Sequence, residues 1–267
     1  MSTSPTARFA ALTLAYHQED YLEPCLRSLA GHCGGLFVMY SELPFTRYNP
    51  RAREEGFASD ATGAILAALQ PEIPGLEVIE GVWEGEDEMR NEGRSAALAS
   101  GFDYLLIVEA DEFYGDGVLE RVVQSVLDSP GPASWWAKMR VPFKYVDWVI
   151  DREDEYLPVA LDLHSGMRFD NRRIPGGSRM RLAPELLCFN MGFVLSDERM
   201  LEKTRTWSHA HQLPAGWYRD KWLNWRPSTR DLHTRVPELW PCTRPMDPAE
   251  LPAVLRGRPQ FRRYDAE

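Results

Sequence analysis

The chain has 267 residues, a formal net charge of −10 and an apolar fraction of 44%, which is ordinary for a globular protein with a substantial core. The acidic balance argues against a dedicated nucleic-acid binder, which normally carries a basic footprint. No run approaches the roughly 18 apolar residues of a membrane span, and residues 1–8 lack the apolar core of a secretory signal, so we expect a cytoplasmic protein with no membrane span.

The charge is distributed unevenly along the chain. Residues 1–160 carry 12 Lys/Arg and 27 Asp/Glu, whereas residues 161–236 carry 13 Lys/Arg and 8 Asp/Glu. The basic middle segment leaves room for a phosphate-bearing ligand or an anionic acceptor. The four cysteines show no CxxC spacing, so we expect reduced, structural thiols rather than a zinc site or a disulfide framework.

Strand and helix patterns alternate through the first half of the chain. Apolar runs predict strands at 9–16, 36–40, 76–80 and 105–108. Helical spacing predicts helices at 21–29, 61–69, 86–99 and 117–127. This alternation predicts an α/β fold with a parallel sheet and right-handed crossovers.

The pattern changes after the Pro-Gly-Pro sequence at residues 130–132. Longer, less regular strands are predicted at 135–149, 160–169 and 186–195. Ser196 is a candidate N-cap for a helix that we expect to continue to about His211, with acids in its first turn. From Pro214 the chain is rich in Trp and Pro and is predicted to form a wrapped tail with short helices.

Three carboxylates follow the most apolar of these strands. The strand at 105–108 is expected to be buried on both faces, and it leads directly into Glu109, Asp111 and Glu112. Acids at the carboxyl end of a parallel strand lie where open α/β sheets bind ligands. Carboxylates there suit a hard divalent cation that shares its ligands with phosphates. The alternative is a solvated acidic turn, but three acids within four residues repel one another without a cation.

Three segments of this sequence resemble the GT-A glycosyltransferases, specifically the family-2-like nucleotide-sugar transferases. They are TLAYHQEDYLEPCLRSL, MRNEGRSAALASGFDYLLIVEADE with an Arg-Asn helix and a DxD-like triplet, and MGFVLSDERMLEKTRTWSHA. The resemblance covers residues 9–127 well and 134–255 more loosely. Two positions depart from the family pattern, because Glu109 replaces the first Asp of DxD and Asn190 stands where many relatives carry His.

The resemblance implies a site built from several parts of the chain. It implies a Mn²⁺ or Mg²⁺ ion bound at Asp111, with Glu109 and His209 as further ligands and Asn190 or His211 as alternatives to His209. The donor-binding residues that it implies are Tyr16, His17, Glu19, Arg90, Asn91 and Glu109. A general base on the acceptor hydroxyl is expected from a carboxylate, and the candidates are Asp170, Glu185 and Glu112.

For most of these residues a structural role is the alternative. Arg90 and Asn91 fit a solvated helix face, and Glu112 fits a helix cap. His211, on a helical stripe with Met200 and Trp207, fits a satisfied core histidine. Four tryptophans could form a sugar-stacking platform, but a core that packs the tail onto the sheet is favoured for most of them: Trp207, Trp217, Trp222 and Trp225.

The predicted fold is therefore a GT-A, Rossmann-like, mostly parallel sheet flanked by helices, with a C-terminal acceptor-side extension. Residues 1–130 form the nucleotide-sugar half and residues 131–267 the acceptor half of one continuous domain. The predicted activity is metal-dependent transfer of a sugar from a UDP-like donor to a hydroxyl of a glycan, lipid-linked sugar, small molecule or, less favoured, modified DNA. The alternatives are a nucleotidyltransferase and a non-catalytic nucleotide-sugar-binding protein.

Overall fold

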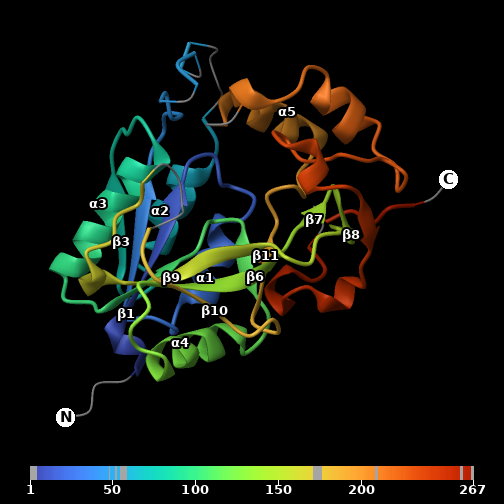
Figure 1. Ribbon diagram of the computed structural model, residues 1–267. Coiled ribbons are helices and arrows are strands. Elements are labelled where there is room, and N and C mark those ends of the chain that lie inside the picture. Colours follow the sequence, from blue (N-terminus) through green and yellow to red (C-terminus); the bar gives the residue numbers. More distant parts are fainter. Residues whose placement is uncertain are drawn as a thin grey trace.

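The computed structural model describes residues 5–47, 49–51, 53–54, 59–170, 176–207, 210–258 and 261–265. Its first half alternates strands and helices as the sequence predicts (Figure 1). The elements, in chain order, are β1 (Phe9–Ala15), α1 (Leu22–Leu29), β2 (Gly35–Tyr40), α2 (Thr62–Leu69), β3 (Leu76–Glu80), α3 (Glu86–Ala99), β4 (Tyr104–Ile107), β5 (Glu112–Tyr114) and α4 (Val118–Asp128).

The second half contains shorter strands than the sequence predicts. They are β6 (Ser134–Arg140), β7 (Pro142–Phe143), β8 (Tyr145–Ile150), β9 (Tyr156–Asp162), β10 (Arg179–Arg181), β11 (Leu187–Asn190) and β12 (Thr243–Pro245). The single strand predicted at 135–149 is wrong, because Lys144 adopts a positive φ of 63° and turns the chain back on itself. The strand predicted at 160–169 is also wrong, because β9 ends at Asp162, whose side chain caps a short 3₁₀ helix (Leu163–Ser165).

One large sheet extends across both halves of the chain. Its order is β3-β2-β1-β4-β9-β6-β11-β5, and β10 pairs with β6 beside this path. The pairs β1–β2, β2–β3, β1–β4, β6–β11 and β6–β10 are parallel, while β4–β9, β6–β9 and β5–β11 are antiparallel. The predicted α/β class with a mostly parallel sheet is confirmed, whereas a fully parallel sheet is not. The strands β7, β8 and β12 form a separate small sheet.

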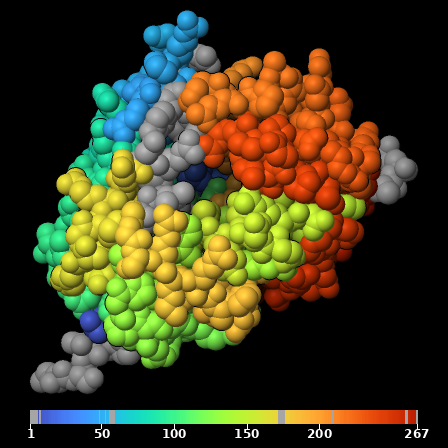
Figure 2. Space-filling view, viewed as in Figure 1, coloured from blue at the N-terminus to red at the C-terminus, as the bar shows by residue number. Residues whose placement is uncertain are grey.

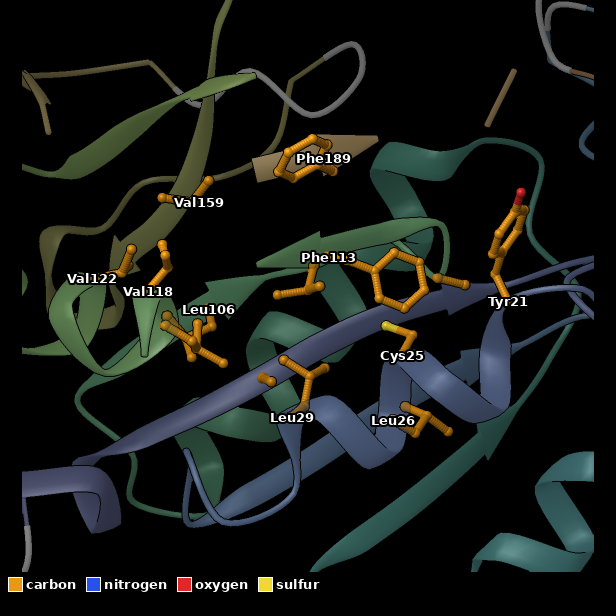
Figure 3. Close-up of a cluster of buried hydrophobic side chains, with 14 of the residues drawn as sticks. Tyr21, Cys25, Leu26, Leu29, Leu106, Phe113, Val118, Val122, Val159 and Phe189 are labelled. Atoms are coloured by element: carbon orange, nitrogen blue, oxygen red, sulfur yellow. The ribbon is translucent and has the colours of Figure 1, made fainter. Parts of the chain in front are cut away.

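Helices cover the large sheet and create its core. On one face α1 contributes Cys25, Leu26 and Leu29, which pack against Leu106 of β4 and Phe113 of β5 in a cluster of fully buried side chains (Figure 3). On the other face α3 packs against β1 and β2, and its Gly93 allows Leu12 to approach closely. Burial on both faces explains why β4 is an unbroken apolar run.

The helix α5 (Asp197–Thr206) begins where the sequence predicts but ends early. The Ser196 side chain accepts a hydrogen bond from the Arg199 N–H, as expected of an N-cap. Trp207 is extended, with φ −60° and ψ 144°, so the helix does not continue to His211 as predicted. His211 instead lies in a 3₁₀ helix (Ala210–Gln212). Consequently the helical stripe predicted to join His211 to Met200 does not exist.

The tail after α5 packs as an aromatic cluster. Trp217, Trp222 and Trp225 are at most 3% exposed and surround Phe143 and Tyr145. A π-helical turn (Tyr218–Leu223) and three 3₁₀ helices (Pro237–Leu239, Pro248–Glu250 and Ala253–Leu255) complete this region. Three of the four tryptophans are thus core residues rather than a sugar platform.

Two further features bear on the sequence predictions. Within the described ranges, no helix is long and apolar enough to cross a membrane. Cys25, Cys33, Cys188 and Cys242 are thiols and are not joined in disulfides.

Candidate functional site

A cavity of about 370 Å³ lies at the carboxyl ends of β1 and β4, beneath α5. It is lined by parts of β1 and the first loop (residues 14, 16–18, 20 and 21), by the acids that follow β4, by residues 190, 192, 193 and 195, and by one face of α5. Figure 2 shows a hollow near the middle of the face, between orange-red C-terminal and yellow-green central segments, with blue N-terminal atoms at its floor. The cavity is therefore built from both halves of the chain, at the sheet edge where α/β proteins bind ligands.

The acids that follow β4 are held by neighbouring residues. Arg90 of α3 is only 4% exposed and donates to the Glu109 carboxylate, with Nη2 2.8 Å from Oε1. The same guanidinium pairs with Glu86 at 3.1 Å, one helical turn earlier. Arg90 and Glu109, both predicted donor residues, thus line the cavity as one ion pair.

Asp111 points into the cavity from the turn between β4 and β5. Its side chain is 14% exposed, and its Oδ2 lies 3.9 Å from the Lys203 ammonium of α5. The Asn190 amide nitrogen lies 3.4 Å from Asp111 Oδ1. Partial burial lowers the pKa of Lys203, an effect that the nearby Asp111 carboxylate opposes. Asp111 and Asn190, both predicted as metal ligands, are therefore brought together in the cavity.

Glu112 lines the same cavity but is fully buried. Its carboxylate accepts the Glu109 N–H at 3.1 Å and lies 3.4 Å from the Asn190 amide nitrogen. The register of the β5–β11 ladder places Glu112 directly opposite Asn190. Glu112 thereby fixes the turn that presents Asp111.

Tyr16 and His17 form the aromatic wall of the cavity. Their rings stack with centroids 4.6 Å apart, and Phe45 packs edge-on to Tyr16 at 6.1 Å. His17 has a positive φ of 52°, which is unusual outside glycine. Its Nδ1 lies 3.0 Å from Glu202 of α5. Burial raises the pKa of the Tyr16 hydroxyl above its usual range.

Two predicted donor residues, Glu19 and Asn91, do not line the cavity. The Glu19 carboxylate accepts the Ala61 N–H at 2.9 Å, at the start of α2. The Asn91 side chain donates to the Phe169 carbonyl at 2.8 Å and accepts the Phe169 N–H at 2.9 Å. Both side chains fix neighbouring loops.

The remaining predicted residues are dispersed. Asp170 and Glu185 are exposed and do not line the cavity, so the structure does not bring them to the other candidates. His211 is exposed and is likewise not a lining residue. His209 lies outside the described residues.

The residue predictions missed most of the contribution of α5. Arg199, Glu202 and Lys203 line the cavity from this helix, and their spacing of three and four residues places them on one face. Arg199 contacts Asp20 at 3.2 Å, Glu202 at 2.7 Å and the His17 carbonyl at 3.0 Å. This spacing was visible in the sequence, but nothing there indicated that α5 folds over the first loop.

The donor atoms that surround Asp111 are oxygens, the ligand type that a hard divalent cation prefers. In the part of the chain that the structure describes, no group of three or more His, Cys, Asp and Glu is arranged to hold a metal. A Cβ atom on Gly192 would overlap Asp111 Oδ2 and lie 3.0 Å from both Asn190 Oδ1 and Lys203 Nζ, so two oxygens converge on one small space. Mg²⁺ and Mn²⁺ accept sites of one or two protein oxygens completed by phosphates and water.

The lining of the cavity is acidic overall, even though it contains several cations. Of its described residues, six are acidic and four are basic, namely Asp20, Glu86, Glu109, Asp111, Glu112 and Glu202 against Arg90, Arg199, Lys203 and Arg235. A diphosphate would therefore meet net repulsion unless it brought a cation of its own.

No protein-family model matches the chain, and no curated protein matches it. Among solved structures, it is similar to S. aureus TarS 1–349 in complex with UDP-GlcNAc (17% identity, 50% of this chain and 35% of that chain, TM-score 0.38). It is also similar to TarS 1–349 alone (13%, 69% and 60%, 0.46) and to 4-diphosphocytidyl-2C-methyl-D-erythritol synthase from Anaerococcus prevotii DSM 20548 (11%, 76% and 98%, 0.43). The chain thus spans about a third to three fifths of the TarS chains, and its function has to be inferred from its own cavity.

Proposed function

We propose that the chain is a glycosyltransferase that moves a sugar from a UDP-like nucleotide-diphospho-sugar to a hydroxyl acceptor, assisted by Mn²⁺ or Mg²⁺. One observation carries this proposal: Asp111 and Asn190 converge at the carboxyl edge of the sheet, in a cavity that is also lined by the stacked rings of Tyr16 and His17. An oxygen-lined point suits a cation with a diphosphate, and the aromatic wall suits a base.

In this proposal each part of the cavity has a distinct task. Tyr16 and Phe45 contact the nucleobase, since they present aromatic surface beside the first loop. Asp111 and Asn190 would hold the metal ion, which supplies Lewis-acid stabilisation of the charge on the departing nucleoside diphosphate. Arg90 holds Glu109 in place, so the turn that carries Asp111 keeps its geometry.

The acceptor side of the proposed site is apolar. Leu157, Phe193 and Trp207 line the cavity, and Trp207 is half-buried rather than part of the aromatic core. A flat indole face suits the apolar face of a pyranose ring. We therefore assign Trp207, rather than the other tryptophans, to sugar contact. Of the three candidate bases, Glu112 lies in the cavity, and no step is assigned to Asp170 or Glu185.

The test is thermal stabilisation by nucleoside diphosphates and their sugars, with and without Mn²⁺. We expect a metal-dependent rise in Tm with one nucleotide class in the wild type. The rise should disappear in Asp111→Ala, because the variant lacks the carboxylate that would hold the metal. A matched control is Asp116→Ala, which removes a carboxylate from the loop before α4, outside the cavity lining.

The proposal fails if no nucleotide stabilises the wild type, or if Asp111→Ala responds as the wild type does. Product analysis then separates the two enzyme classes that use such a site. Release of a nucleoside diphosphate supports glycosyl transfer, whereas release of pyrophosphate would indicate a nucleotidyltransferase.

A further inference from the structure

Lys203 already places a positive charge beside the carboxylate at the centre of the cavity. Its ammonium donates to the Gly192 carbonyl at 2.8 Å and lies 3.9 Å from Asp111 Oδ2. The same ammonium lies 5.4 Å from the centroid of the Phe193 ring and 6.0 Å from that of Trp207. Two aromatic rings and a carbonyl thus hold a cation in a defined position.

This cation stands beside the carboxylate to which a metal ion would have to bind. The position of a Cβ atom on Gly192 lies 3.0 Å from Lys203 Nζ and 3.0 Å from Asn190 Oδ1, and it overlaps Asp111 Oδ2. Because Nζ lies 3.9 Å from Asp111 Oδ2, a divalent ion bound to that carboxylate at about 2.1 Å would lie no more than about 6 Å from the ammonium. At such a distance in a partly buried site, two positive charges repel each other.

The repulsion disappears only if a ligand supplies negative charge to both cations. A diphosphate does this, because its oxygens can coordinate the metal and accept a hydrogen bond from the ammonium. The two carboxylates nearest to Asp111 in the chain are already engaged, since that of Glu109 is held by Arg90 and that of Glu112 by the Glu109 N–H and Asn190.

We propose that Lys203 is the resident cation of this site: in the free protein it neutralises Asp111 and keeps divalent ions off, so that metal binds only together with the diphosphate. This inference rests on the proposed function for the identity of the ligand. Metal and donor then bind cooperatively, each raising the affinity of the other by the same factor.

The experiment measures Mn²⁺ binding to the free protein by electron paramagnetic resonance, without nucleotide. Lys203→Met removes the charge and keeps an unbranched side chain between the two rings. We expect it to bind Mn²⁺ at least about tenfold more tightly than the wild type. Lys138→Met is the matched control, because it removes one lysine from a lysine–carboxylate pair (Lys138–Glu153) outside the cavity lining. Its Mn²⁺ affinity should equal that of the wild type.

Two further variants keep the test decisive. Lys203→Gln replaces the charge with a neutral donor and serves if the methionine variant does not fold. Lys203→Arg keeps the charge and should bind Mn²⁺ as weakly as the wild type. Adding Asp111→Asn to Lys203→Met should abolish the gain, because the carboxylate is its source. Equal Mn²⁺ affinity in the wild type, Lys203→Met and Lys203→Gln would overturn the inference.

Nucleotide binding is measured separately, so that the two proposals fail differently. In the wild type, UDP or GDP should raise the Mn²⁺ affinity at least about tenfold, and in Lys203→Met this factor should shrink. A wild type that binds no nucleotide would refute the proposed function. The Mn²⁺ affinities of Lys203→Met and Lys138→Met, measured without nucleotide, would still show whether Lys203 keeps divalent ions off Asp111.

Discussion

Gly192 lies at the convergence of three polar side chains, from Asp111, Asn190 and Lys203. Its own φ is not positive, so the backbone conformation does not require glycine there. The requirement is spatial, because any Cβ atom would occupy the volume toward which the two oxygens point. Only glycine lacks a Cβ atom and so leaves this space open. Gly192 therefore marks the site independently of the acids.

Gly192→Ala should therefore damage ligand binding more than stability. The Asp111 carboxylate is the end of a flexible side chain and can rotate away, so we expect a loss of no more than about 1 kcal/mol in the free energy of unfolding. The affinity for nucleotide in the presence of metal should fall at least about tenfold. Gly115→Ala, in the loop before α4, is the control. Unchanged nucleotide binding in Gly192→Ala would show that a Cβ atom at residue 192 does not obstruct the site.

Arg90 neutralises two carboxylates while almost completely buried. Arg90→Met should lower the free energy of unfolding by about 3 kcal/mol, because Glu109 would be left partly buried without its cation. The double variant Arg90→Met/Glu109→Gln should recover part of that loss, since the unpaired charge is then absent. Urea denaturation measures both values, with Arg121→Met on the exposed face of α4 as a control. Additive losses would show that the pair is not coupled.

At the scale of elements, α5 is fastened to the first loop through Arg199. Its guanidinium contacts Asp20, Asp60 and the His17 carbonyl, all from the first 60 residues, so it bridges the two halves of the chain across the cavity. The helix otherwise offers few buried anchors, with Met200 and Thr206 as its buried residues. The position of this wall therefore depends on polar contacts more than on apolar packing.

Arg199→Met should loosen α5 without unfolding the protein. We expect faster amide hydrogen exchange in α5 and in residues 17–20, while β1 and β4 keep their protection. Arg205→Met changes an exposed arginine on the same helix and should leave the exchange pattern unaltered. If exchange in α5 is equal in the two variants, Arg199 does not fasten the helix.

The elements of the first half could be predicted because their signals are local. Each strand is a short apolar run followed by a turn, and α3 occupies the predicted residues 86–99. The strands of the second half could not be delimited, because their bounds depend on distant partners. The antiparallel pairing of β9 ends at Asp162 against β4 and at Leu161 against β6, and a positive φ at Lys144 has no clear sequence signal.

The candidate site also contains residues that could be predicted from local sequence and residues that could not. The acids after β4 and Arg90 could be found because they flank one strand and one helix in a recognisable order. Lys203 and Arg199 could not be assigned, since their importance arises only when α5 folds over the cavity. Glu19 and Asn91 were predicted from the family resemblance, but in the structure their side chains fix neighbouring segments.

At the scale of the whole molecule, stability should depend on pH through His233. Its Nδ1 accepts the N–H groups of Arg235 and Val236, and its ring packs edge-on against Trp240. Burial, together with the charges of Arg235 and Arg152, lowers the pKa of His233 from 6.5 to about 4. Protonation would turn the accepting nitrogen into a donor that faces two N–H groups.

The direction of the effect follows from proton uptake. Because the unfolded chain binds this proton at a higher pH than the folded chain, the stabilisation is complete above pH 6.5 and is lost as the pH falls toward 4. The loss should reach about 3 kcal/mol at most. Urea denaturation between pH 7.5 and 4.5 measures it, and His233→Asn should flatten the profile because its Oδ1 accepts the same bonds. His164→Asn, at an exposed position, should not flatten it.

The pairing of β5 with β11 has a consequence for the newly made protein. A chain emerging from the ribosome acquires β1 to β4 and all three acids early, yet β5 joins the sheet beside a strand translated much later. Forming such a contact requires closing a long loop, which is entropically slow. We expect the carboxylates to stay unassembled until Asn190, Gly192 and Lys203 have been synthesised. A chain that has not yet been translated through α5 therefore lacks a complete cavity. We expect ligand binding only after α5 has been synthesised.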